Sequence, residues 1–585
     1  MKRVLIVLLA VLGAWIAWSL VTLPPAAAVL PVAPPVAPIV AGVYHVHSRA
    51  SDGTGTAEEI AAAAGRAGLT FVILTDHGDA FRQPAAPRYY GRVLCLDATE
   101  ISTIEGHYVA IGLGRPPYRL AGEARDVVED VARLGGFGVA AHPDSGRTTL
   151  RWDEWDAPFD GLEWLNGDSQ WRETSVWHLF PMLIQYGARA AETLVSRFTR
   201  PRTTLDRWDR LTARRPVVAL AASDAHARLG LHGKGDPDED TIYVRLPSYE
   251  AVFRAFCLNV ELDKALTGNA TADAQAIVSA LRNGRVSSSI TGLAGPANFS
   301  FDAWSGSAQA KQGGLLSLEH GVMLRASANI PPGGSLVLLK DGQVVHEERS
   351  QSLRFATDRP GVFRVEARLP GASVADMPWI LSNPIYVGVR HEEAGGTPSE
   401  PITSAPFPPG PDWQIEHDPS STGTASELHS GDVAAGSQFQ FHLADRGAGS
   451  EFVAMVTSHV APLRDADAIR FSIRASRPLR VSVQVRLSGR AVDRRWVRSV
   501  YADQDARDVT VSMADLRVAG TGQKAPFDRG QIDSLLFVID TVNSRPGDQG
   551  TIWIEKLATE RLAVRGVSAS LHRGLPAQVR TVSSK

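Results

Sequence analysis

Short apolar runs, each long enough for a buried strand, recur through the first part of the chain and end in residues of the kinds that bind metals. These runs, with the polar residues that follow them, are 39–44 with His45 and His47, 71–74 with Asp76 and His77, 92–96 with Glu100, 137–141 with His142, and 216–222 with Asp224 and His226. A further histidine, His107, precedes the run 108–113. Because the carboxyl ends of parallel barrel strands meet at one rim, we expect these polar side chains to lie together.

Helical patterns separate the strand runs. Thr56 precedes a helical segment over 57–67 that stops at Gly68, and a second segment over 124–134 is closed by Gly135. Residues 167–210, rich in Trp and Arg, predict a helical insertion that walls the pocket. Alternating strands and helices favour a parallel α/β barrel over residues 42–295.

From about residue 296 the apolar positions alternate with a period of two. Residues 296–390 predict an Ig-like β-sandwich, and 391–411, rich in Pro, Gly, Ser and Glu, predict a linker. Residues 412–565 predict a second, jelly-roll-like β domain, similar in general pattern to galactose-binding modules, and 566–585 form a C-terminal tail. The histidines of this second β domain, His429 and His459, are expected at the surface.

The first 28 residues have the parts of an export signal. Lys2 and Arg3 precede a largely apolar run over 4–23, which ends in a Pro- and Ala-rich stretch at 24–28. The run is long for a cleaved signal peptide and about as long as a membrane span, so cleavage and retention as a signal anchor both remain open. Residues 29–41 form a Pro-rich tether. The rest of the chain is expected outside the cytoplasm, periplasmic or extracellular, either secreted or anchored.

Charge and cysteine content narrow the class of protein. The net charge of −3 argues against a dedicated nucleic-acid surface. The two cysteines, Cys95 in a strand run and Cys257 in a helical-looking segment over 248–262, do not form a disulfide framework, and we expect buried free thiols.

The chemistry begins at His45 and His47. Residues two apart on a strand point the same way, so both imidazoles can hold one metal ion, and Asp52 follows in a Gly-containing turn. Six of the sixteen histidines, with Asp52, Glu100 and Asp224, are more ligands than one tetrahedral ion can use, so several ions are implied. Glu163 and Asn166, at the end of another strand run over 161–166, are candidates to support these ligands.

This series of motifs resembles the polymerase and histidinol phosphatase (PHP) superfamily of metallo-phosphoesterases over roughly residues 40–290. Residues 280–286 and 379–386 are similar to its carbaryl hydrolase-like (CehA/McbA) branch. The resemblance implies an α/β fold in which a distorted (β/α)7-type PHP barrel is followed by the two all-β domains.

The same resemblance implies three divalent ions, Zn, Mn or Fe. It places His45, His47, Glu100 and Asp224 around the first ion. Glu100 bridges to a second with His107 and His142, while Asp52, His77 and His226 surround the third. Some relatives carry histidine where this chain has Asp52, which bears on the metal preference of the third site.

A hydroxide bridging such ions would hydrolyse phosphoesters, with Asp224, His226 and Glu100 as the catalytic residues. Arg49, Arg147 and Arg228 are expected to bind the phosphate, with Arg82 and Lys234 on adjoining loops. An ester or carbamate hydrolase is an alternative, and so is a non-catalytic surface-binding protein. Partners would be a small phosphoester or ester and a glycan or envelope polymer at the C-terminal β domain.

Overall fold

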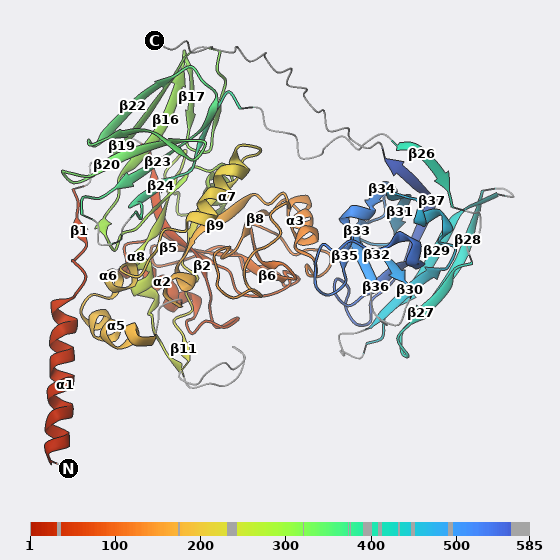
Figure 1. Cartoon of the computed structure of the whole chain (residues 1–585), viewed down its shortest axis with the longest axis horizontal. Helices are drawn as coiled ribbons and strands as arrows, with labels where there is room; N and C mark the ends of the chain where they lie inside the picture. The colour runs from red at the N-terminus through yellow and green to blue at the C-terminus, as the bar shows by residue number, and fades with distance from the viewer. Residues whose placement is uncertain are drawn as a thin grey trace, which may run out of the picture.

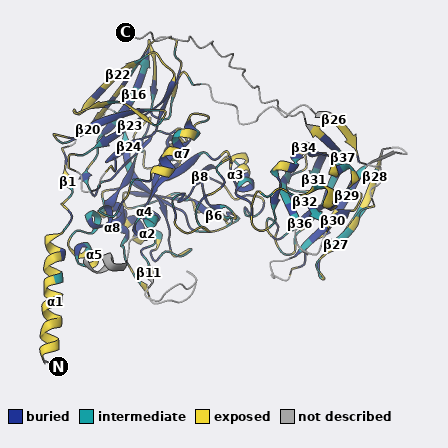
Figure 2. Cartoon of the chain, viewed as in Figure 1, coloured by how far each residue is buried: buried dark blue, intermediate teal, exposed yellow. Residues whose placement is uncertain are grey.

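The computed structural model describes residues 2–31, 37–172, 176–230, 243–319, 321–371, 374, 376–389, 401–407, 412–430, 433–445, 451–488 and 495–562. These residues form a mixed helix and sheet protein with an N-terminal helix, a central α/β part, a β-sandwich and a second β domain (Figure 1). Side chains are buried inside each of the three globular parts, whereas the N-terminal helix is largely exposed (Figure 2).

Two sheets make up the central part. The first contains the parallel strands β2 (Ile39–Val46), β3 (Phe71–Leu74) and β5 (Val93–Asp97), with β4 (Arg88–Tyr90) at its edge. The second has the order β10 (Val218–Ala222), β9 (Gly161–Asn166), β8 (Phe137–Ala140), β7 (Gly106–Ile111), β6 (Thr99–Thr103). Isolated bridges, Val46 with Ala225 and His77 with Glu100, join the two sheets at the strand ends.

Not all of these strands are parallel. β6 pairs with β7 and β7 with β8 in antiparallel fashion, so the expectation of a wholly parallel barrel was wrong here. Only Ile104 and Glu105 separate β6 from β7, too few residues for a parallel crossover, and Gly106 adopts the positive φ of 117° that the tight turn requires.

The predicted helices are present. α2 (Ala57–Arg66) starts with a capping box in which Thr56 accepts from the Glu59 amide and Glu59 accepts from the Thr56 amide, and α3 (Ala124–Arg133) covers β7 and β8. The described residues of the segment 167–210 are mostly helical, as predicted. Its helices are α4 (Gly167–Arg172), α5 (Val176–Ala188), α6 (Ala190–Val195) and α7 (Arg202–Thr212), and α8 (Tyr249–Ala255) and α9 (Ala270–Arg282) follow later in the chain.

Both cysteines are buried and free, as predicted. Cys257, however, lies on β13 (Cys257–Glu261), which pairs with β2 and β14 (Val286–Ser289), and not in a helix. The apolar run around it fits either structure, and pairing between two strands decides the outcome.

The sheet that contains β2 continues through β13 and β14 into the β-sandwich, where β14 pairs with β24. This layer adds β18 (Leu315–Leu316), β20 (Ser335–Lys340), β21 (Gln343–Glu348), β23 (Gly361–Arg368), β24 (Ile380–Ser382) and β25 (Ile385–Val387). The opposite layer has β16 (Phe299–Ser305), β17 (Ala308–Lys311), β19 (Val322–Ala328) and β22 (Ser352–Thr357). The buried pairs Arg200–Glu366 and Arg364–Asp209 add polar contacts across this junction.

The C-terminal β domain has two six-stranded sheets around a core of its own. One contains β26 (Pro401–Pro406), β28 (Thr422–Ser430), β29 (Val433–His442), β31 (Ala468–Ala475), β34 (Arg507–Ser512) and β37 (Gln549–Leu562). The other contains β27 (Gln414–His417), β30 (Phe452–Thr457), β32 (Leu479–Leu487), β33 (Arg495–Ala502), β35 (Arg517–Val518) and β36 (Ile532–Asp540). β26 lies within the predicted linker 391–411 and pairs with β37.

At the N-terminus, α1 (Lys2–Val21) projects from the rest of the molecule (Figure 1). Its span Arg3–Val21 is long and apolar enough to cross a membrane, and 6% of it is buried. The following β1 (Ala28–Val29) pairs in parallel with β15 (Ala294–Gly295), so part of the expected tether lies against the fold.

Candidate metal centre

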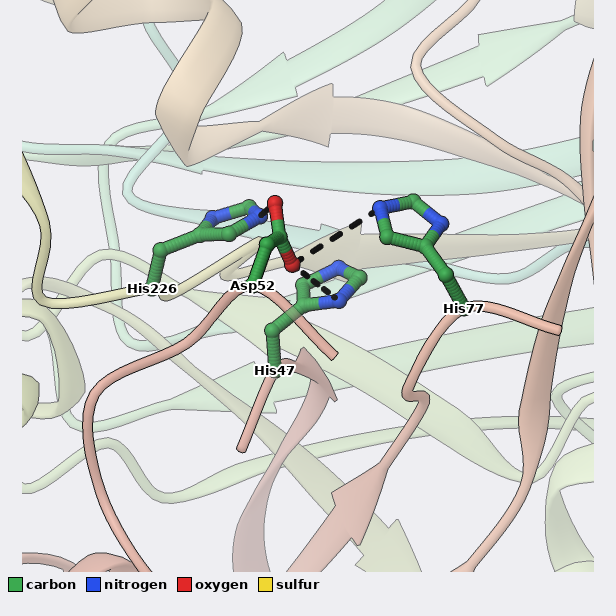
Figure 3. Close-up of side chains that lie close together, drawn as sticks. All are labelled: His47, Asp52, His77 and His226. Atoms are coloured by element: carbon green, nitrogen blue, oxygen red, sulfur yellow. Dashed lines mark ion pairs between the residues drawn. The ribbon is translucent and has the colours of Figure 1, made fainter. Parts of the chain in front are cut away.

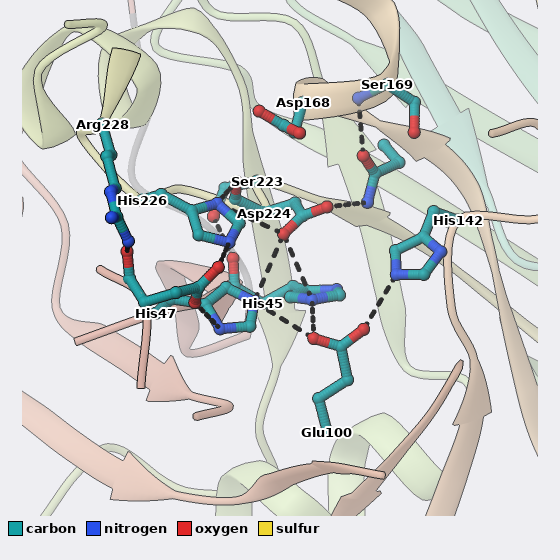
Figure 4. Close-up of polar contacts among 12 residues, drawn as sticks. His45, His47, Glu100, His142, Asp168, Ser169, Ser223, Asp224, His226 and Arg228 are labelled. Carbon is teal, nitrogen blue, oxygen red and sulfur yellow. Dashed lines mark hydrogen bonds and ion pairs between the residues drawn. The ribbon is translucent and has the colours of Figure 1, made fainter. Parts of the chain in front are cut away.

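The structure brings all nine predicted metal ligands together at the strand ends, in four overlapping groups. Within each group the ligand atoms lie within 4.8 Å of one another. The groups are His45, His47 and Asp224; His45, Glu100 and His142; His77, Glu100 and His107; and His47, Asp52, His77 and His226. Residues from six separate segments thus converge on one centre. Figure 4 shows His45, His47, Glu100, His142 and Asp224, among these ligands, around the same point.

Glu100 and Asp224 stand on two sides of the pair His45 and His47. The Nε2 atoms of His45 and His47 lie 3.1 and 3.2 Å from Glu100 Oε2, and 3.4 and 3.3 Å from Asp224 Oδ1. The other carboxylate oxygen of Glu100, Oε1, is 2.8 Å from both His107 Nδ1 and His142 Nε2. Glu100 therefore faces two neighbouring sets of imidazoles, as a bridging ligand would.

Asp52 lies at the middle of the fourth group of ligands (Figure 3). Its Oδ2 lies 3.1 Å from His226 Nε2, and its Oδ1 lies 3.4 Å from His47 Nδ1 and 3.8 Å from His77 Nε2. His77 also reaches Glu100 Oε2 through Nδ1, at 3.4 Å. His47 thus connects this group to the group of His45 and Asp224, and His77 connects it to the group of Glu100 and His107.

Three of the ligands have left-handed backbone. The φ angles are 64° at His45, 29° at His142 and 48° at Asp224, a region that L-residues rarely occupy. Each lies where a strand ends and the chain turns, so the turn aims the side chain at the centre. Such strain persists only where the surrounding structure holds it, and it is concentrated at functional sites.

Glu163 and Asn166 support the ligands, as the sequence suggested. Glu163 accepts from the ring Nδ1 of His45 at 2.5 Å and from the backbone amide of His142 at 2.7 Å. Asn166 donates to Glu163 at 2.9 Å and to Asp224 Oδ2 at 3.1 Å. A carboxylate on the far nitrogen of a metal-binding histidine fixes the tautomer and raises its basicity.

Two further residues support the centre, and the sequence had assigned this role to neither of them. Asp76 accepts from the backbone amide of Ser48 and from the hydroxyls of Ser48 and Ser51, each at 2.7 Å, and so holds the loop between His47 and Asp52. Its place directly before His77 was the available signal. The Tyr249 hydroxyl lies 2.7 Å from the carbonyl oxygen of His47, a contact with backbone that no sequence pattern marks.

The electrostatics of the centre favour positive charge. Burial lowers the pKa of His45, but the carboxylates of Glu163, Asp224 and Glu100 outweigh burial and raise it well above its usual value. Burial likewise opposes charge on His47, yet hydrogen bonds with Asp224 and Glu100 raise its pKa to about 10. Against burial, the histidines hold the pKa values of Glu100 and Asp224 well below their usual range. A cation that replaced these protons would meet ionised ligands.

The predicted phosphate-binding arginines do not all lie at the centre. Arg228 lies beside the ligands in Figure 4. It is half-buried, its Nη1 is 3.4 Å from the Asp52 carbonyl oxygen, and its guanidinium lies over the Tyr243 ring. Arg49 turns to the Thr54 carbonyl oxygen and to Glu59, while Arg82 binds Asp97. Arg147 is exposed on the loop after His142, and Lys234 lies outside the described residues.

No protein-family model matches the sequence, and no curated protein matches it. Among solved structures, one that is similar is a two-domain protein containing a predicted PHP-like metal-dependent phosphoesterase from Bacteroides vulgatus ATCC 8482. The match has 15% identity and a TM-score of 0.28, and covers 62% of this chain and 99% of that chain.

Two further similar structures are carbohydrate-binding modules. The family 11 module of the cellulase Lic26A-Cel5E of Clostridium thermocellum is 14% identical with a TM-score of 0.22, over 29% of this chain and 99% of that one. A family 30 module is 12% identical with a TM-score of 0.19, over 29% of this chain and 89% of that one. The geometry of the site itself supports the function proposed below.

Proposed function

We propose that this protein is an exported metal-dependent hydrolase that cleaves phosphoesters. The observation that carries the proposal is the convergence of nine imidazole and carboxylate ligands, in overlapping groups that share Glu100, His45, His47 and His77. Such a mixed oxygen and nitrogen donor set suits Zn, Mn or Fe, and shared ligands suit closely spaced ions. We assign the same three ligand sets that the PHP resemblance implies, and we infer a distorted (β/α)7-type barrel as their scaffold.

Divalent ions bound there would supply an activated water at neutral pH and charge stabilisation for the phosphoryl oxygens. The residues of the chain fix where this happens. Glu163 keeps the proton of His45 on Nδ1 and leaves Nε2 free to face Glu100 and Asp224. His226 Nδ1 lies 2.9 Å from the Asp224 carbonyl oxygen, which likewise turns Nε2 toward Asp52.

Three residues are assigned to catalysis itself. Glu100 and Asp224 are both buried, and their carboxylates would fix the positions of the ions beside the reacting phosphoryl group. The His226 side chain is 12% exposed, so as a ligand of the third ion it would hold that ion at the edge of the centre, where substrate can reach it. Of the arginines, Arg228 is the one placed to bind a phosphate oxygen, because it lies beside Asp52 at the same edge.

The alternative hydrolysis of a carbonyl ester or carbamate would use the same centre, since an activated water attacks either group. Among the described residues, the half-buried Arg228 beside the ligands favours an anionic substrate. The non-catalytic alternative is disfavoured because all nine ligands and their supporting residues Glu163 and Asn166 are in place.

A substrate screen tests this proposal. Purified full-length protein, supplied with Mn or Zn, should hydrolyse phosphate mono- or diesters faster than carboxyl esters, and a chelator should stop the reaction. Arg228→Ala should raise KM for the phosphoester and leave carboxyl ester turnover unchanged, with the solvent-facing Arg147→Ala as its control. Faster carboxyl ester hydrolysis that Arg228→Ala does not change would favour the alternative.

We also propose that the C-terminal β domain binds a neutral glycan on the outer face of its β28–β29–β37 sheet. A hollow of about 430 Å³ there is lined by hydroxyl and amide side chains, among them Thr424, Gln440 and Thr551. Beside it the Trp553 indole is held by Gln438 at 3.2 Å and by Arg474 over its ring.

Binding to insoluble polysaccharides tests the glycan site. Trp553→Ala should release the protein from the polymer, because an aromatic plane is the natural partner of a sugar ring's apolar face. Trp304→Ala, which removes the matching tryptophan under Arg325 in the β-sandwich, should leave binding unchanged. Equal binding by both variants would place the polymer elsewhere.

A further inference from the structure

The end of α1 and the segment after it are built into the fold of the catalytic part. The buried Gln185 on α5 donates its amide to the carbonyl oxygens of Ser19 and Thr22, at 3.3 and 3.0 Å, and to the Thr22 hydroxyl at 3.1 Å. The last carbonyls of a helix have no partner within the helix, so Gln185 acts as a cap supplied by another element.

The contacts continue along the next ten residues. Arg189 donates to the Pro24 carbonyl oxygen, and Glu192 accepts from the Ala27 amide at 3.2 Å. The amides of Ala28 and Leu30 donate to Leu293 and Gly295 at 3.0 and 2.9 Å, and Leu30 is buried in the core of the β-sandwich. The small-residue stretch expected as a cleavage site is therefore part of a docked strand.

We propose that α1 is retained in the mature protein as a membrane anchor, and that it holds the catalytic part against the outer surface of the bilayer through α5. Cleavage after Ala28 would remove every partner named above for Gln185, Arg189 and Glu192. Gln185 is 5% exposed with α1 in place, and the contacts of Gln185, Arg189 and Glu192 with residues 19–27 exist only in a chain that keeps its first residues.

A lipid bilayer is the environment that α1 fits. The helix has 20 residues, or about 30 Å, which matches the hydrocarbon thickness of a membrane. Its apolar side chains are exposed all round, with Leu5, Leu8 and Val11 between 58 and 61% exposed, which no aqueous helix tolerates (Figure 2). Lys2 and Arg3 lie at its free end, and the next basic residue is Arg49, so the charges place the catalytic part outside the cytoplasm.

A chain of hydrogen bonds links α5, which contacts the end of α1, to the metal centre. Tyr186 on α5 accepts from the Ser248 amide at 2.8 Å at the start of α8. The next residue, Tyr249, contacts the carbonyl oxygens of His47 and His226 at 2.7 and 3.1 Å. The helix that caps α1 is therefore linked through α8 to the loops that carry two of the ligands.

The first test determines the N-terminus and the location of the full-length protein, expressed with a C-terminal tag in an exporting bacterium. We expect intact mass to include residues 2–28. We also expect the protein in the membrane pellet, resistant to alkaline carbonate and released by detergent. A mature N-terminus between residues 26 and 30 would overturn retention, and release by salt alone would overturn insertion in lipid.

The second test examines docking on α5 with a short thiol crosslinker. In membranes, Thr22→Cys with Gln185→Cys should form a crosslinked peptide pair, because these side chains are in contact. Leu8→Cys with Gln185→Cys is the control, since fourteen further residues of helix place position 8 about 20 Å away. Retained but uncrosslinked protein, or equal yields from both pairs, would overturn the docking. Neither test depends on hydrolytic activity.

Discussion

The metal centre and the contact between α3 and the C-terminal β domain both bury several charged side chains, but the partners of those charges differ. At the contact, Arg480 is almost fully buried and binds Asp130 through Nε at 2.8 Å and Nη2 at 3.0 Å, with Asp126 at 3.1 Å from Nη1. Arg498 adds a second guanidinium to Asp126 and Glu129. In the metal centre, the ion-pair partners of Asp52, Glu100 and Asp224 among the described residues are histidines.

This difference separates a structural charge cluster from a ligand site. A guanidinium stays protonated under all ordinary conditions, so the Arg480 cluster is complete as it stands. An imidazole can exchange its proton for a metal ion. The charge of a carboxylate surrounded by histidines can therefore be balanced either by protonated histidines or by a bound cation. The two clusters should therefore respond in opposite ways to substitution, acid and chelators.

The largest effect is expected from the ligands themselves. His45→Ala and Asp224→Ala should each lower kcat/KM by about a thousand-fold or more, because bound ions supply several kcal/mol of charge stabilisation. The fold should survive, which thermal unfolding and circular dichroism would show. His429→Ala, at a 53% exposed histidine of the C-terminal β domain, is the control. Near-normal activity of either ligand variant would remove the metal assignment.

Breaking the structural cluster should lower stability and leave metal content unchanged. Arg480→Ala removes the buried arginine between Asp126 and Asp130. Because these carboxylates keep Arg498 and Arg133, the free energy of unfolding should fall by about 3 kcal/mol, the lower end of the range for a broken buried pair. Arg477→Ala removes a partly exposed pair with Asp548 and should cost under about 1 kcal/mol. Denaturant unfolding measures both. If the Arg480→Ala protein lost its bound metal instead, the distinction between a structural charge cluster and a ligand site would be wrong.

A third buried cluster lies at the junction of α7 and the β-sandwich. Its carboxylate Glu366 is paired with arginines, so it shows how the stability of such a cluster should depend on pH. Burial raises the pKa of Glu366, but Arg200 and Arg364 outweigh burial and lower it to about 2. Since the folded pKa lies below the unfolded value, the stability is present above about pH 4.5 and is lost as pH falls toward 2, a change of about 3 kcal/mol. The difference in stability between wild type and Glu366→Gln should therefore shrink over this range. A constant difference would mean that Glu366 is not ionised in the fold.

The smallest effect should come from a residue behind the ligands. Glu163→Gln keeps the shape of the side chain and removes the charge that holds His45 Nδ1, so metal affinity or activity should fall about 10- to 100-fold. Metal titration of the apoprotein would measure the change, with Glu427→Gln at the exposed edge of the C-terminal β domain as the control. An unchanged affinity would show that the tautomer of His45 needs no carboxylate.

The strand ends and their ligands were visible in the sequence because an apolar run followed by His, Asp or Glu is a local pattern. Tyr249 was missed because it acts on backbone oxygens of segments distant in the chain. The β6–β7 hairpin was missed although only Ile104 and Glu105 join the strands, and such a short connection predicts antiparallel pairing. Strand β13 was mistaken for helix because an apolar run around Cys257 fits either period until its partners β2 and β14 are known.

The metal content of purified full-length protein tests the central claim most directly. After reconstitution with Zn, Mn or Fe and removal of free metal, elemental analysis should find two to three ions per chain. Asp224→Ala should hold fewer, and His429→Ala should match wild type. Phosphoester hydrolysis should rise and fall with that content. Less than one ion per chain, or hydrolysis that a chelator does not change, would contradict the account.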